Sequence, residues 1–86
     1  MPEISRFFGV VITINYNDHN PPHFHAEYQG FEAVYDIKKS VKIEGYFPPS
    51  LNKIIIKWAK KYKKELLENW ELTRSGEPPN KIKGAD

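Results

Sequence analysis

The eleven residues from Asp18 to Tyr28, DHNPPHFHAEY, contain the side chains of this sequence that are best suited to chemistry. They include all three histidines of the 86-residue chain, at positions 19, 23 and 25. One residue separates His23 from His25, so on a β-strand both side chains project from the same face. Two imidazoles placed in this way can share a metal ion, or can act as general base and general acid near neutral pH.

A metal site at this position needs at least one further ligand. His19, Asp36 or Glu27 could complete a set with the histidine pair and leave a coordination position open for water. Among these, the three histidines His23, His25 and His19 are the main candidate metal ligands. The candidate cofactor is a divalent metal ion. Imidazole and carboxylate ligands suit zinc, iron, nickel or manganese without selecting one of them.

A metal-free site would use the histidine pair for acid–base chemistry, such as in-line attack of an RNA 2′-hydroxyl on the neighbouring phosphate. Arg6, Arg74 and the six lysines within residues 53–64 are candidate cations for that phosphate. The expected catalytic residues are His23, His25, Asp36 and Asn15, and the expected substrate-binding residues are Asp18, His19 and Arg6.

A third interpretation is structural. The segment NPPH forms a stiff turn, because proline fixes its own φ and restricts the residue before it. The histidines would then only hydrogen-bond to Asp18, Asn15 or Asp36.

The composition indicates one small domain with a real core. Of the residues, 40% are hydrophobic and 14% aromatic, which is too much for a disordered chain of this length. The absence of cysteine excludes disulfides and thiolate metal sites. No apolar run is long enough for a membrane span, and we expect a cytoplasmic protein.

The first half of the sequence alternates apolar and polar residues with a period of two, as in FFGVVITINY and HFHAEY. This pattern predicts four antiparallel strands near residues 6–16, 23–29, 31–37 and 41–45. A two-residue turn at Gln29–Gly30 would place Phe24 beside Tyr35 and His23 opposite Asp36. Matching the apolar residues of the first strand would place Tyr16 beside Phe24 and Asn15 beside His25.

After Pro48–Pro49 the apolar residues recur every three or four positions, which predicts one long helix from about residue 49 to 75. Trp58 lies at the centre of the apolar stripe and should be buried, whereas Trp70 lies towards its edge and could anchor a partner. The predicted fold class is α+β: a four-stranded antiparallel meander packed on one C-terminal helix, with a single domain in residues 1–79 and a flexible tail in residues 80–86.

Three segments of the chain, MPEISRFFGVVI, YNDHNPPHFHAEYQGFEAVYDI and LLENWELTRSGE, resemble the small prokaryotic family called domain of unknown function 4160. The most specific match is the proline–proline–histidine–x–histidine pattern at Pro21, Pro22, His23 and His25. The resemblance implies one component of a toxin–antitoxin-like two-gene module with a small protein partner encoded nearby.

Three functions follow as alternatives. The first is a component of such a module that acts on RNA through the histidine-lined sheet face. The second is a non-enzymatic regulatory module that binds a protein or DNA. The third is a metal-dependent hydrolase at the same histidines. A nucleic acid is a candidate partner, and self-association is compatible with the sequence.

Overall fold

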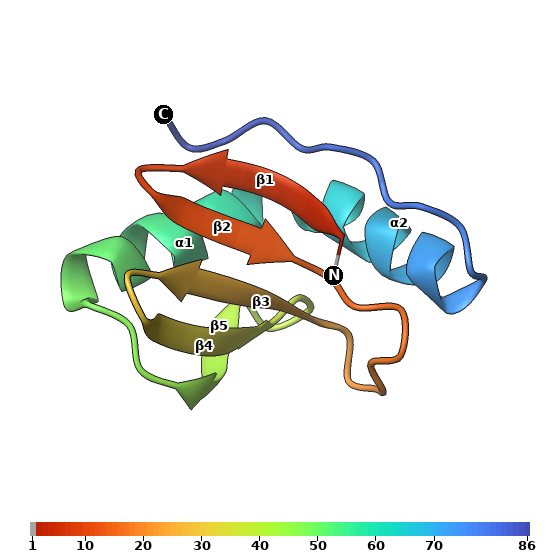
Figure 1. The fold of residues 1–86 in the computed structure, drawn as a ribbon, viewed down its shortest axis with the longest axis horizontal. Helices are drawn as coiled ribbons and strands as arrows, with labels where there is room; N and C mark the ends of the chain where they lie inside the picture. Colours follow the sequence, from red (N-terminus) through yellow and green to blue (C-terminus); the bar gives the residue numbers. More distant parts are fainter. Residues whose placement is uncertain (1) are drawn as a thin grey trace.

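The computed structural model describes residues 2–86 as an antiparallel sheet with two helices packed against it (Figure 1). Its elements are β1 (Glu3–Phe7), β2 (Val10–Thr13), β3 (His23–Tyr28), β4 (Phe31–Asp36), β5 (Val41–Gly45), α1 (Pro49–Lys61) and α2 (Lys63–Arg74). Each strand pairs with the next along the chain, in the order β1-β2-β3-β4-β5. The predicted α+β class with an antiparallel sheet is confirmed, but the predicted number of four strands is wrong.

The additional strand comes from a hairpin inside the first predicted strand. Residues 6–16 were expected to form one strand, whereas the chain reverses at Phe8–Gly9 between β1 and β2. Both turn residues have positive φ, 52° for Phe8 and 79° for Gly9, as a tight hairpin turn requires. Glycine accepts this conformation readily but phenylalanine does not. Because Phe8 occupies one of the two turn positions, the apolar run in the sequence gives no sign of a turn.

The pairing of β3 with β4 agrees with the predicted register. Phe24 is paired with Tyr35, and His23 with Asp36. The pairing of β2 with β3 differs from the prediction by two residues, because Ile12 lies opposite Ala26 and Thr13 opposite His25. A shift of two residues keeps every side chain on its expected face, but it places Asn15 and Tyr16 beyond β2 rather than beside β3.

The predicted single helix is divided at Tyr62, whose φ of −107° and ψ of 25° depart from helical values. The hydrogen bonds from Tyr62 N to Trp58 O and from Leu66 N to Tyr62 O span the break. A straight helix over residues 49–75 would be about 40 Å long, whereas the longest dimension of the Cα trace is 34 Å. One straight helix would therefore extend beyond the rest of the molecule, whereas two shorter helices do not. Within residues 2–86, neither is long and apolar enough to cross a membrane.

The core lies between the sheet and the helices, and Trp58 is at its centre. Trp58 is 3% exposed, which confirms the prediction that it is buried. Its ring centroid lies 5.1 Å from that of Phe7 and 5.7 Å from that of Phe24. Phe24 stacks on Tyr35 at 5.3 Å, and the Tyr35 hydroxyl donates a hydrogen bond to Asn52 Oδ1 of α1.

Residues 80–86, expected to be a flexible tail, run beside β1 (Figure 1). Ile82 is 8% exposed, and its backbone N–H donates to the carbonyl of Ile4 in β1. The Lys83 carbonyl accepts a hydrogen bond from Trp58 Nε1. Asn69 exchanges two hydrogen bonds with the backbone of Asn80. This C-terminal segment is therefore attached to both the sheet and the helices.

Candidate functional site

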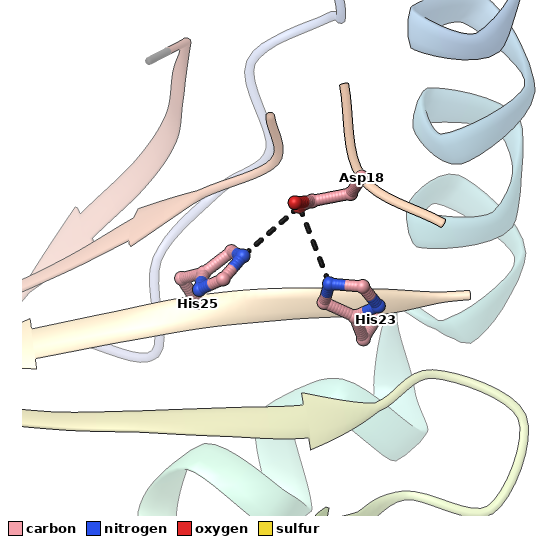
Figure 2. A group of neighbouring side chains, drawn as sticks. All are labelled: Asp18, His23 and His25. Carbon is pink, nitrogen blue, oxygen red and sulfur yellow. Dashed lines mark hydrogen bonds and ion pairs between the residues drawn. The ribbon is translucent and has the colours of Figure 1, made fainter. Parts of the chain in front are cut away.

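Asp18, His23 and His25 converge on one point, and we call them the histidine cluster (Figure 2). Asp18 Oδ2 lies 2.9 Å from His25 Nε2 and 3.2 Å from His23 Nε2. The histidines come from β3, whereas Asp18 comes from the loop between β2 and β3. One ligand atom from each residue lies within 4.8 Å of the other two. His23 and His25 therefore project from the same face of β3, and a single carboxylate oxygen contacts both imidazoles.

The hydrogen bonds of His23 determine where its proton lies. Nδ1 is 2.7 Å from the carbonyl oxygen of Pro21. A carbonyl can only accept, so Nδ1 must carry a proton. In the neutral imidazole Nε2 is then a lone pair directed at the Asp18 carboxylate, and in the imidazolium it carries a second proton. Either a cation or a proton must therefore lie between His23 Nε2 and Asp18.

The histidine cluster is partly shielded from water. The side chains of His23, Asp18 and His25 are 13%, 19% and 30% exposed, so His25 is the most open of the three. Burial raises the pKa of the Asp18 carboxyl, but the hydrogen bond from His25 and the charges of both histidines outweigh burial and leave that pKa lowered. Asp18 is therefore a carboxylate at neutral pH and can accept hydrogen bonds or bind a cation.

Arg74, at the end of α2, holds the loop that carries Asp18. Its guanidinium donates hydrogen bonds to the backbone carbonyls of Asn15, Tyr16 and Asp18. The same group lies 4.0 Å from the ring centroid of Trp70, one helical turn earlier. Arg74 was expected to be a candidate cation for phosphate, but its donors are directed at these carbonyls.

Trp70 connects α2 to the histidine cluster. Its ring centroid lies 5.2 Å from that of His23, so His23 packs against α2. Trp70 is only 2% exposed. The prediction that it lies at an exposed edge and anchors a partner is therefore wrong.

The other two expected catalytic residues, Asp36 and Asn15, do not contact the histidine pair in the expected way. Asp36 is 5% exposed, and its carboxylate accepts a hydrogen bond from the backbone N–H of Lys39 in the β4–β5 turn. It lies outside the histidine cluster. Asn15 contributes its backbone carbonyl to Arg74, while its Oδ1 is shielded from solvent and has no hydrogen-bond partner within residues 2–86.

His19, Arg6 and Glu27 also lie outside the histidine cluster. His19 is exposed and is not among the grouped ligands. Arg6 is exposed on β1 and pairs with Glu3 at 2.8 Å. Glu27 follows His25 on the same face of β3 but does not join the cluster. The third member of the histidine cluster is instead Asp18, which was expected to bind substrate.

His25 also lines an open groove of about 320 Å³ on the face of the sheet that carries Glu27. The groove is lined by Val11, Thr13, His25, Ala26, Glu27, Glu32, Ala33, Val34, Glu44 and Gly45. It contains three carboxylates and no lysine or arginine. A ligand that approaches His25 along this face therefore meets negative charge.

The chain belongs to the family described as Domain of unknown function (DUF4160), whose model matches residues 9–71. The match includes the histidine cluster and Trp70, and it ends before Arg74. No curated protein and no solved structure matches this chain significantly.

Proposed function

We propose that this protein is a metal-dependent hydrolase whose divalent ion is held by His23 Nε2, His25 Nε2 and Asp18 Oδ2. The observation that carries the proposal is the hydrogen bond from His23 Nδ1 to the Pro21 carbonyl. A metal-binding imidazole usually donates its other N–H to a carbonyl or carboxylate, which fixes the tautomer and aims the lone pair. His23 has this arrangement.

The spacing of the ligand atoms supports the same proposal. Ligand atoms about 2.0–2.1 Å from one ion, at angles between octahedral and tetrahedral, lie roughly 2.9–3.4 Å apart. Asp18 Oδ2 lies 2.9 and 3.2 Å from the two imidazole nitrogens. Two nitrogens and one carboxylate oxygen suit zinc or ferrous iron.

Three protein ligands leave coordination positions open, which distinguishes catalytic from structural metal sites. An ion at such a site supplies a Lewis acid and activates water for hydrolysis. Hydrolysis needs only the ion, water and a substrate, so it is the simplest reaction for this ligand set. His25 is the most exposed ligand, and we expect the substrate to approach from its side.

Metal-free cleavage of RNA by the histidine pair has less support. Both ring nitrogens of His23 are already engaged, by Pro21 and by Asp18. Only His25 Nδ1 remains for proton transfer, and the groove beside it carries Glu27, Glu32 and Glu44. These carboxylates would repel a phosphate backbone. The toxin–antitoxin-like context that the family resemblance implies is compatible with either chemistry and remains a proposal about partners.

Zinc binding by the purified protein tests the proposal. After treatment with a chelator and its removal, calorimetric titration should show one zinc ion per chain. His23→Ala, His25→Ala and Asp18→Ala should each lose this binding. His19→Ala is the matched control, because His19 is exposed and outside the cluster, and it should bind zinc normally. Cobalt, as a coloured substitute, should report loss of imidazole ligands in the visible spectrum.

Activity is measured with p-nitrophenyl acetate and bis(p-nitrophenyl) phosphate as general hydrolase probes. Turnover should require zinc, should stop when the chelator is added, and should persist in His19→Ala. Equal zinc binding by the unaltered protein and by His23→Ala would contradict the metal site. RNA cleavage that survives chelation but not His25→Ala would support the metal-free alternative instead.

A further inference from the structure

A second groove, of about 430 Å³, lies between α1, the β1–β2 turn and the C-terminal segment. It is lined by Phe8, Ile54, Lys57, Trp58, Lys61, Tyr62, Lys83, Gly84, Ala85 and Asp86, and we call it the lysine groove. Three lysines from two segments of the chain meet there, and Asp86 is the single acidic residue in the lining. The lysine groove therefore has the opposite charge to the groove beside His25.

The positive charge continues along α1. This helix contains Lys53, Lys57, Lys60 and Lys61, all exposed, and no acidic residue. Within residues 2–86 none of these lysines forms an ion pair with a carboxylate, since the ion pairs involve Glu3 and Asp18 only. Soluble proteins usually mix charges of both signs on a surface. The uncompensated charge on α1 therefore favours an anionic partner.

Phe8 adds an aromatic surface at the edge of the lysine groove. Phe8 is 52% exposed. Its backbone φ of 52° is unfavourable for a residue with a bulky side chain. Tyr62 supplies a second ring, with Lys61 Nζ 5.4 Å from its centroid. An aromatic ring next to several lysines is the combination with which proteins bind single-stranded nucleic acids, by base stacking and phosphate contacts.

We propose that the lysine groove binds a single-stranded nucleic acid, with a base stacked on Phe8 and phosphates at Lys57, Lys61 and Lys83. The proposal does not depend on the histidine cluster. The β1–β2 turn lies close to Tyr28, since a Cβ at Gly9 would lie 3.3 Å from the Tyr28 ring. Tyr28 is at the opposite end of β3 from His23. The two sites therefore occupy different ends of the sheet.

Fluorescence anisotropy with a labelled oligouridine of roughly 12 nucleotides, within the usual range of site sizes, tests the proposal. The double variant Lys57→Ala, Lys61→Ala should lower the affinity about tenfold. It should also reduce the slope of log K against log salt concentration by about 1.4, at about 0.7 per phosphate contact. The control Lys38→Ala, Lys39→Ala removes the same charge from the β4–β5 turn and should leave affinity and slope nearly unchanged.

Phe8→Asn removes the ring while retaining a residue that tolerates positive φ. It should lower the affinity about 5- to 150-fold, the equivalent of one stacked base, without changing the salt slope. Phe8→Leu, which keeps an apolar side chain, should do the same if stacking is the cause. Melting curves confirm that each variant is folded.

Four results would overturn the proposal. They are absence of binding by the unaltered protein, equal losses from the two lysine pairs, unchanged affinity in both Phe8 variants, and equally tight binding of inorganic polyphosphate. The last result would show that the groove recognises charge alone.

Discussion

At the scale of single residues, Arg74 links the helices to the proposed metal centre. Asp18 contributes the only carboxylate of the histidine cluster, yet it lies on a loop rather than on a strand. Arg74 fixes that loop through three backbone carbonyls from 56 or more residues away in the sequence. The position of the carboxylate therefore depends on a side chain that cannot itself bind a metal.

Replacement of Arg74 should weaken both the fold and the metal site. Arg74→Ala should reduce the free energy of unfolding by about 2–3 kcal/mol, because carbonyls bound by a charged donor lose their partner. Arg74→Lys should lose less of the free energy of unfolding than Arg74→Ala, since lysine keeps the charge but not the planar fork of donors. In both variants zinc affinity should fall while the two histidine ligands remain. Chemical denaturation and calorimetric zinc titration measure the two effects.

Arg6→Ala is the control for Arg74, because Arg6 is exposed and pairs only with Glu3. It should change neither stability nor zinc affinity appreciably. Unaltered zinc affinity in Arg74→Ala would show that the loop holds Asp18 without the guanidinium.

The histidine pair could be predicted from the sequence, whereas the choice among its candidate partners, Asp18, Asn15 and Asp36, could not. His23 and His25 share a face because strand geometry alternates at every residue, and this is a local property. The choice of Asp18 over Asp36 depends on the path of the β2–β3 loop, which Arg74 of α2 sets. No local pattern contains that information.

At the scale of secondary structure elements, turn chemistry decided which pairings could be predicted. Gln29–Gly30 ends one alternating segment and begins the next, and the β3–β4 register follows from it. The β1–β2 turn uses Phe8 with positive φ. Because Phe8 is apolar, the strand-like pattern of the sequence continues through the turn and conceals it. The predicted β2–β3 register was wrong by two residues and placed Asn15 beside His25, where the structure has Thr13.

Tyr35 joins β4 to α1 and should make the stability of the protein sensitive to alkaline pH. Burial raises the pKa of Tyr35 to about 12, above the value of about 10 for an unfolded tyrosine. The stabilisation by the neutral phenol is therefore complete below about pH 10 and is lost as pH rises towards 12. Tyr35→Phe should cost about 1 kcal/mol at neutral pH, through the lost hydrogen bond to Asn52, and should remove this alkaline loss.

Asn52→Ala separates the two effects of Tyr35. It removes the hydrogen-bond partner but leaves the phenol buried, so stability at neutral pH should fall while the alkaline loss remains. Urea denaturation of the three proteins from about pH 8 to 11 makes the comparison, over the range in which an unfolded tyrosine ionises. If the free energy of unfolding changes with pH in the same way in the unaltered protein and in Tyr35→Phe, burial of Tyr35 is not the cause of the alkaline loss.

At the scale of the whole molecule, size limits what periodicity can predict. The apolar stripe from Leu51 to Leu66 is continuous across Tyr62, and no proline or glycine marks the bend. A straight helix over residues 49–75 would be about 40 Å long, longer than the 34 Å extent of the whole Cα trace. The path of residues 80–86 is likewise set by β1, which lies at the other end of the sequence.

The C-terminal segment covers the edge of the sheet formed by β1, and its removal should affect stability and association together. Deletion of residues 80–86 exposes the apolar surface beneath Ile82 and leaves Trp58 Nε1 and Asn69 without their backbone partners. We expect the free energy of unfolding to fall by about 2–4 kcal/mol, which is a large part of the stability of a domain this small. Ile82→Ala should produce much of this loss, because it empties the same position.

Deletion should also promote self-association, because an uncovered edge strand offers unpaired backbone groups to another chain. In the intact protein the N–H of Ile82 bonds to the Ile4 carbonyl of that edge. Light scattering should therefore detect larger oligomers for the deletion variant than for the intact protein at the same concentration. Lys83→Ala is the control, since the Lys83 contact with Trp58 uses only the backbone carbonyl. A deletion variant with an unchanged melting temperature and unchanged association would show that β1 does not need this segment as a cover.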